Sequence, residues 1–245
     1  MKKICLLFLL LIGSSNYALE ENPCDCSLKL SEMEYGFGAP FPVYREFTEQ
    51  EYNERIKKLD LKTADFTDSY ITAYMSYRLK KYDIAMKYFE RAEKRISVEN
   101  SLRYDHNAYF YLYYGLNSEA LKDYDNAKKC YIKQKDPYYI HLINAKIYRE
   151  KKELKKAEKE YLLAQCVNLY EMINYDPYEE IAQMYFENKK YILAKEYIKK
   201  FIACAEYEMQ NGGLGYEPSD DSHIKKANKL LEKIELKIKK QKIKQ

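Results

Sequence analysis

A spacing pattern recurs four times along the chain: a Tyr or Leu, an Ala three residues later, and a bulky residue four positions after that Ala. The repeated alanines are Ala85, Ala127, Ala157 and Ala194, and each has a small residue twelve positions earlier, at Ala73, Gly115, Ala145 and Ala182. Small residues at paired positions let two antiparallel helices approach closely, while the bulky residue fills the space beside the next pair. The pattern therefore predicts a stack of helical hairpins in which each hairpin covers the apolar face of its neighbour.

The composition favours long helices joined by brief turns. The 245 residues include 28 Tyr and 9 Phe but only 7 Gly and 6 Pro, and 33% of them are charged. Gly and Pro are the residues that most often interrupt helices, so their scarcity predicts an all-α fold. An ordinary bundle of Tyr-rich helices is the alternative, but a bundle does not need a small residue and an Ala at one fixed separation in every unit.

The repeated pattern resembles the tetratricopeptide repeat (TPR) family over roughly residues 65–205. The second unit is the closest match, with Tyr111, Tyr114, Gly115, Tyr124, Ala127 and Tyr131 at the family's positions. We call Ala85, Ala127, Ala157 and Ala194 the marker alanines, and successive ones are 42, 30 and 37 residues apart. The repeat length in the family is about 34 residues. We therefore expect an extended turn or helix around residues 97–106 and a short third unit. The resemblance implies a right-handed α-solenoid of about four helix hairpins.

Local signals place the helices of this solenoid. The hairpins are expected at 67–79 and 82–96, 107–119 and 124–133, 139–149 and 154–170, and 178–188 and 191–209. Asp136-Pro137 is expected to close the second hairpin and Asp176-Pro177 to open the fourth. Thr48 and Glu51 form a capping-box signature, which predicts a leading helix at 49–59. Together these elements define a helical repeat domain at residues 48–210.

Residues 1–18 have the organisation of a bacterial signal peptide. Lys2 and Lys3 precede an apolar run at residues 4–12, and Ala18 offers a small residue for cleavage. The run is shorter than the roughly 18 residues that a membrane-spanning helix needs, so secretion is favoured over a membrane anchor. We expect a mature protein in the periplasm or outside the cell. Residues 19–47 contain several Pro and Gly and are expected to form an irregular segment.

Cleavage would leave five cysteines, an odd number for an oxidising compartment: Cys24, Cys26, Cys130, Cys166 and Cys204. At least one is therefore expected to be unpaired or to form an intermolecular bond. Cys166 and Cys204 fall near the ends of neighbouring hairpins and could approach each other, or could be small buried apolar residues. The Cys24-Asp25-Cys26 segment lacks the further ligands that zinc requires, so a tether to Cys130 or another thiol is preferred over a metal site.

A Gly-rich and polar stretch at residues 211–222 is the clearest break in the chain. Ser222 is placed to cap a final helix with one apolar stripe, formed by Ala227, Leu230, Leu231, Ile234 and Ile238. A basic amphipathic helix at 222–245 is therefore expected to cap the stack. Because residues 224–245 contain nine Lys and two Glu, contact with an anionic membrane surface or polymer is a second interpretation. Nucleic acid is not expected, since the protein is predicted to be exported and the tail lacks Arg.

The sequence contains no catalytic signature and predicts no cofactor. The three histidines, His106, His141 and His223, lie far apart, and none falls in a metal-binding or nucleophile motif. His141 occupies a core position of the repeat, so packing is its expected role. We expect a protein that is not an enzyme.

In the TPR family the first helices of successive hairpins line a concave groove, and the resemblance carries its ligand-facing positions onto this chain. They are Tyr70, Tyr74, Tyr77, Arg78, Leu112, Leu116, Lys146, Arg149, Gln183 and Phe186. The three tyrosines share one side of a helix and predict an aromatic ridge. Lys146 with Arg149 could pair with an acidic group on a partner. The leading helix at 49–59 could instead cover the ridge.

These expectations support a leading hypothesis and an alternative. The leading hypothesis is an exported, non-enzymatic scaffold that binds a protein or peptide partner in its concave groove. The alternative is a glycan-binding envelope protein that stacks sugars on its Tyr-rich surface.

Overall fold

The computed structural model describes residues 47–99, 104–167, 176–211 and 221–243, and within these ranges it contains ten helices and no strand. The helices are α1 (Glu49–Lys58), α2 (Phe66–Arg78), α3 (Tyr82–Glu99), α4 (Tyr104–Ala120), α5 (Tyr124–Gln134), α6 (Pro137–Glu150), α7 (Leu154–Cys166), α8 (Asp176–Glu187), α9 (Tyr191–Asn211) and α10 (Asp221–Lys242). The predicted all-α class is confirmed. The predicted signal peptide, the segment at 19–46, and Cys24 and Cys26 lie outside the described residues.

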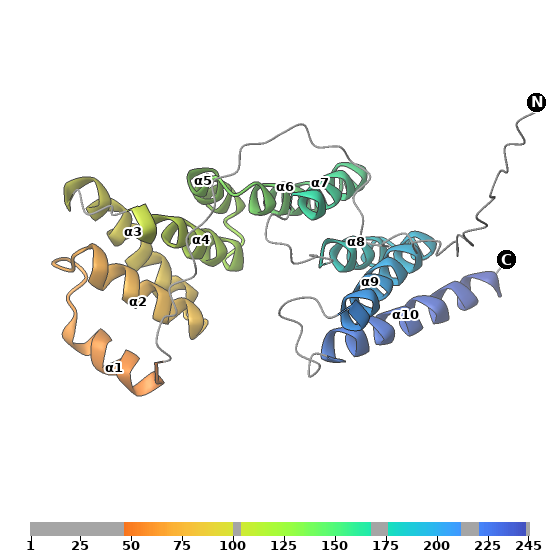
Figure 1. Cartoon of the computed structure of the whole chain (residues 1–245), viewed down its shortest axis with the longest axis horizontal. Helices are drawn as coiled ribbons and strands as arrows, with labels where there is room; N and C mark the ends of the chain where they lie inside the picture. Colours follow the sequence, from red (N-terminus) through yellow and green to blue (C-terminus); the bar gives the residue numbers. More distant parts are fainter. Residues whose placement is uncertain (1–46, 100–103, 168–175, 212–220, 244–245) are drawn as a thin grey trace, which may run out of the picture.

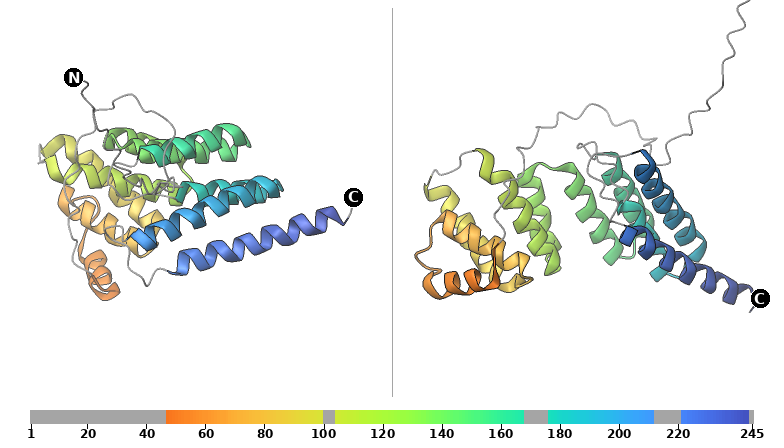
Figure 2. Two further views of the ribbon diagram at one scale, coloured as in Figure 1. Left: turned by 45° about the vertical axis from the view of Figure 1, so that its right-hand side comes forward. Right: turned by 60° about the horizontal axis from the view of Figure 1, so that its bottom comes forward.

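The helices form an α-solenoid of four hairpins, as predicted. The hairpins are α2–α3, α4–α5, α6–α7 and α8–α9, and each packs on the next along the chain. Figure 1 and the right panel of Figure 2 show the stack as an arch, with α1–α4 in one limb, α5–α7 at the top and α8–α10 in the other limb. α10 packs on α9 at the end of the stack.

The apolar core runs along the length of the stack instead of surrounding one centre. One cluster of buried side chains joins α2, α3 and α4 and includes Cys130 of α5. A second joins α4, α5 and α6, and a third joins α6 to α10. Each of the seven paired alanines has no exposed surface, and Gly115 is also buried. A solenoid core is expected to be distributed in this way, because every hairpin depends on its neighbours for apolar cover.

The two helices of every hairpin are joined by a turn of the same geometry. Lys80, Lys122, Lys152 and Lys189 have left-handed backbones, with φ between 58° and 61°. In each turn the next amide donates to the carbonyl five residues before it, over 2.8–2.9 Å. This is the hydrogen bond of the Schellman motif, in which Gly is the usual left-handed residue. The left-handed lysine stands five residues before the repeated alanine in every hairpin. The four hairpins are therefore built alike.

Replacing Lys122 with Gly is expected to raise the free energy of unfolding by about 1 kcal/mol, because Gly adopts a positive φ without steric cost. Lys122 is exposed, so the change removes no packing. Lys129→Gly, at an exposed position within α5, is the matched control and is expected to lower stability by about 1 kcal/mol. Urea unfolding of the two variants checks this prediction, and changes of the same sign would contradict it.

The leading helix begins with the capping box that the sequence predicts. The Thr48 amide donates to the Glu51 carboxylate over 2.7 Å, and the Glu51 amide donates to the Thr48 hydroxyl over 3.1 Å. α1 packs on α2 through Tyr52, which is 2% exposed and whose hydroxyl lies 3.3 Å from that of Ser76. α1 thus covers the first hairpin at the amino-terminal end of the stack.

Some predicted helix boundaries are wrong, for reasons of local chemistry. The Asp136 carboxylate accepts a hydrogen bond from the Tyr138 amide, and Pro137 is the first residue of α6. This pair therefore opens the third hairpin instead of closing the second, as suits a capping Asp and a Pro in the first turn. α10 already begins at Asp221, so Ser222 lies inside the helix and is not its cap. The long α3, which runs to Glu99, contributes to the wide spacing after the first hairpin.

Candidate partner-binding face

The aromatic ridge predicted on α2 is largely buried. Tyr70 is 3% exposed and Tyr74 is 6% exposed. The Tyr70 ring lies 5.4 Å from that of Phe110, and the Tyr74 ring lies 4.7 Å from Tyr113 and 6.4 Å from Phe47, measured between centroids. Rings of α4 and the ring of Phe47, which lies just before α1, supply this cover. Ile56 of α1 packs against the same cluster of buried side chains. Only the edge of the ridge remains accessible.

That edge is formed by Tyr77 and Arg78. Tyr77 is half-buried, with its ring 5.9 Å from Tyr113 and 6.0 Å from Tyr82. Burial raises the pKa of the Tyr77 hydroxyl, which therefore stays protonated at neutral pH. Arg78 is exposed, and its guanidinium donates to the Tyr74 hydroxyl over 2.9 Å.

The remaining positions of the predicted site on α4 and α8 are also divided between the buried core and the accessible surface. Leu112 is 5% exposed and belongs to the core between α4, α5 and α6. Leu116 and Phe186 are half-buried, with the Phe186 ring 5.7 Å from that of Tyr191. Gln183 is half-buried and donates to Glu187 over 3.0 Å. Burial thus leaves Tyr77, Arg78, Leu116, Gln183 and Phe186 accessible at the surface.

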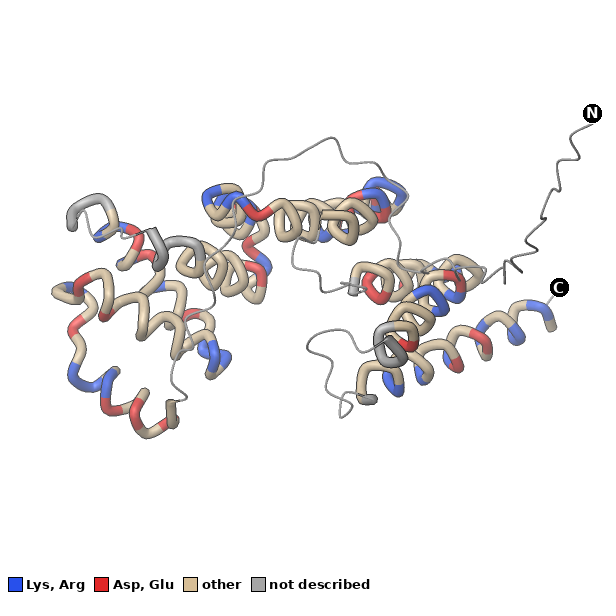
Figure 3. The backbone as a smooth tube through the Cα atoms, viewed as in Figure 1, with Lys and Arg blue, Asp and Glu red and all other residues tan. Residues whose placement is uncertain are grey.

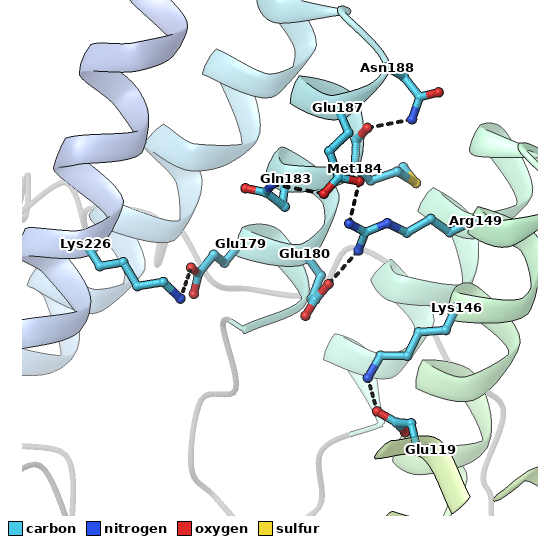
Figure 4. A network of polar contacts seen from close by, with 10 residues as sticks. All are labelled: Glu119, Lys146, Arg149, Glu179, Glu180, Gln183, Met184, Glu187, Asn188 and Lys226. Carbon is cyan, nitrogen blue, oxygen red and sulfur yellow. Dashed lines mark hydrogen bonds and ion pairs between the residues drawn. The ribbon is translucent and has the colours of Figure 1, made fainter. Parts of the chain in front are cut away.

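Ion pairs link the first helices of successive hairpins (Figure 4). Glu119 of α4 pairs with Lys146 of α6. Arg149 of α6 lies 2.9 Å from Glu180 and 2.7 Å from Glu187, both on α8. In the last step Glu179 of α8 lies 2.8 Å from Lys226 of α10.

We use the name first-helix face for the surface that these contacts connect, formed by Tyr77, Arg78, Leu116, Lys146, Arg149, Gln183 and Phe186. The sequence predicted that Lys146 and Arg149 would be available to an acidic partner. In the structure both already face carboxylates of neighbouring hairpins, and their side chains are 26% and 23% exposed. Their first role is therefore to connect the repeats.

A buried carboxylate that the sequence did not indicate connects the last two hairpins. Glu158 of α7 is 9% exposed. Its carboxylate accepts hydrogen bonds from the hydroxyls of Tyr185 at 2.9 Å and Tyr197 at 2.5 Å, and from the Lys155 ammonium at 2.8 Å. Burial alone would raise the pKa of Glu158, but these hydrogen bonds outweigh it and lower the pKa. In the sequence Glu158 lies in a charged run that resembles an ordinary solvated helix face.

The histidine and cysteine assignments are partly revised. His141 Nδ1 lies 2.7 Å from a Glu160 carboxylate oxygen, so it makes a polar contact and not only the predicted packing contacts. Cys130 is a buried free thiol, so it is not the attachment point of the predicted tether and is an unpaired cysteine of the kind that the odd count predicts. Burial raises the pKa of this thiol to about 12. Cys166 and Cys204 are both disulfide-bonded. Within the described ranges no group of His, Cys, Asp and Glu side chains could hold a metal ion.

Comparison with known proteins shows a similarity of fold and no similarity of sequence family. No family model and no curated protein matches the sequence. Among solved structures, the fold is similar to the crystal structure of yeast Tom70, with 19% sequence identity and a TM-score of 0.41. The match covers 80% of this chain and 45% of the Tom70 chain, so it spans less than half of that protein.

Proposed function

We propose that this protein is an exported, non-enzymatic scaffold that binds a peptide or protein partner on the first-helix face. The observation that carries the proposal is the continuity of that face. Ring contacts join α2 to α4, and ion pairs join α4 to α6, α6 to α8 and α8 to α10. A surface held together in this way loses little conformational freedom on binding, and such preorganisation favours affinity.

Apolar anchors on this face are provided by Tyr77, Leu116 and Phe186, which are half-buried in the free protein. Aromatic side chains in such positions often carry much of the binding energy of an interface. An acidic partner would have to displace Glu119 or Glu187 from the cations that they already pair with. We therefore expect apolar side chains of the partner, more than its charges, to supply the affinity.

The glycan-binding alternative receives less support from the packing. Stacking of sugars needs aromatic rings whose faces are open to solvent. The Tyr70 and Tyr74 rings are instead packed against other aromatic rings and are at most 6% exposed. A peptide or protein partner fits the half-buried anchors better.

The proposed envelope setting has two supports. The first is the arrangement of residues 1–18, in which two lysines precede a short apolar run. The second is the pair of disulfide-bonded cysteines, Cys166 and Cys204, because such bonds persist mainly in oxidising compartments. Within the described ranges no helix is long and apolar enough to cross a membrane.

Site-specific photo-crosslinking in intact cells tests this function. A photoreactive amino acid replaces Arg78 or Gln183 on the first-helix face, and Lys87 or Lys159, exposed on the second helices α3 and α7, in the matched controls. We expect a discrete protein adduct from the first two positions and none from the controls. Phe186→Ala should lower the yield of that adduct about tenfold, the effect of losing an anchor worth roughly 1.4 kcal/mol.

Circular dichroism of each variant establishes that it remains folded. Equal crosslinking from both sets of positions, or an adduct that survives protease digestion and contains sugar, would contradict the proposal. Folded variants that give no adduct at Arg78 or Gln183 would also contradict it.

A further inference from the structure

α10 has a second apolar stripe that faces away from the stack. Ile224, Ala227 and Ile234 are at most 7% exposed, and Ala227 and Ile234 belong to the core that α9 shares. Leu236 is instead 52% exposed, and Ile243, just after the helix, is 75% exposed. Leu236 and Ile243 are seven residues apart, so they lie on the same side of the helix, two turns from each other. At 100° per residue that side is opposite the buried stripe.

The exposed apolar pair is surrounded by lysines. Lys229, Lys233 and Lys240 project from the same side of the helix and are exposed, and Lys237 and Lys239 flank it. The carboxylate of Glu235 lies 2.6 Å from Lys195 of α9, so it does not offset the charge of the outer face. Glu232 is exposed four residues before Leu236, on the same side of the helix, and offsets one of these positive charges. The outer face therefore keeps a net positive charge. Figure 3 shows basic residues along the whole length of α10, with few acidic positions between them.

The position of α10 leaves this outer face accessible. Its main contact among the described elements is with α9. Figure 1 and the left panel of Figure 2 show that its carboxyl-terminal end extends past α9 at the end of the arch. Docking on the outer face would therefore leave the packing on α9 and the first-helix face unchanged.

We propose that the outer face of α10 docks on an anionic lipid bilayer with the helix axis parallel to the surface. Leu236 and Ile243 enter the boundary between head groups and acyl chains, while the lysines extend along the surface to lipid phosphates. A lysine-rich face with a few apolar residues at its centre is the composition that gives interfacial binding to anionic lipids. The inference rests on the proposed export, which brings the protein to an envelope membrane.

The apolar pair distinguishes a bilayer from other anionic ligands. A soluble polyanion would contact the lysines and gain nothing from Leu236 or Ile243. An acidic protein surface could use both, but it would bind in the absence of lipid. We favour the bilayer because the apolar residues are few and widely spaced, which suits shallow insertion better than a packed protein interface.

Vesicle co-sedimentation tests the proposal. The protein is expressed from residue 19, because the apolar residues 4–12 would bind vesicles by themselves. We expect at least about tenfold stronger binding to vesicles of mixed phosphatidylglycerol and phosphatidylcholine than to phosphatidylcholine alone. Raising the salt concentration from about 0.1 M to about 0.5 M should weaken this binding strongly, because salt screens the charges.

Two variants separate insertion from charge. Leu236→Ser with Ile243→Ser should lower binding to the anionic vesicles about tenfold, because the apolar contribution is lost. Ile132→Ser, which removes an equally exposed side chain from α5, should leave binding unchanged. Unchanged thermal unfolding of both variants shows that the fold is intact.

The outcomes are distinct from those of the partner experiment, because no protein partner is present in the vesicle assay. Equal binding to neutral and anionic vesicles, or wild-type binding by the Leu236→Ser and Ile243→Ser variant, would overturn the proposal. So would binding to soluble polyphosphate or an acidic protein without binding to anionic vesicles. Failure of the crosslinking experiment alone would remove the proposed partner site and leave the lipid result intact.

Discussion

Gly115→Ala is expected to destabilise the protein by about 1–3 kcal/mol, although Ala is the better helix former by about 1 kcal/mol. A Cβ atom on Gly115 would lie 2.4 Å from Cε1 and 2.8 Å from Cδ1 of Tyr131. The Tyr131 ring has no room to move away, because it is fully buried and stacked 5.1 Å from the Tyr139 ring. Its hydroxyl also donates to Glu119 over 3.2 Å. The steric cost therefore exceeds the gain in helix propensity.

Urea unfolding followed by circular dichroism measures this change. The same substitution in a Tyr131→Leu background provides the control, because the smaller side chain removes the clashing ring atoms. In that background Gly115→Ala should be neutral or stabilising. A wild-type protein that gains stability from Gly115→Ala would show that α4 and α5 do not approach as closely as the structure indicates.

Glu158→Ala is expected to cost about 2–4 kcal/mol, because it leaves two phenol hydroxyls without their acceptor at a buried site. Tyr185 is fully buried and Tyr197 is 7% exposed, so water can replace the lost carboxylate only poorly. Glu158→Gln keeps one acceptor oxygen and should lose less. Glu206→Ala, at an exposed position on α9, should change stability by less than about 0.5 kcal/mol.

The contribution of Glu158 is also expected to depend on pH. Its pKa is lowered in the folded protein, below the value of about 4.3 expected for an unfolded chain. Its stabilisation is therefore fully present above the unfolded pKa and disappears as the pH falls through the folded pKa. The difference in unfolding free energy between wild type and Glu158→Gln should shrink between about pH 7 and about pH 3. A difference that stays constant over this range would contradict the ionised state of Glu158.

The fold could be predicted from the sequence because its signals are local and repeated. Each pair of small residues, such as Ala73 with Ala85, predicts where the two helices of a hairpin come into contact. The capping box of Thr48 and Glu51 predicts the start of a helix. The geometry of the turns between the helices could not be predicted from the sequence. Left-handed positions are usually marked by Gly, whereas here they are held by lysines such as Lys80 and Lys122, which give no such signal.

The candidate face could be predicted only in part, because its character depends on contacts between distant segments. The resemblance to the TPR family identified the helices that form it, but not the burial of Tyr70 and Tyr74 under rings of α4 and Phe47. The partner of Lys146 lies one hairpin earlier in the chain, at Glu119. Charged residues are found in most helices of this sequence, so only the packing shows which of them pair.

An experimental structure of the chain tests the central claim most directly, since both proposed surfaces depend on the stacking of hairpins. The four marker alanines should lie at equivalent contacts between the two helices of each hairpin, and Tyr77, Leu116 and Phe186 should lie on one face across α2, α4 and α8. A structure in which the helices surround a single central core, or in which these three side chains point in different directions, would contradict the account.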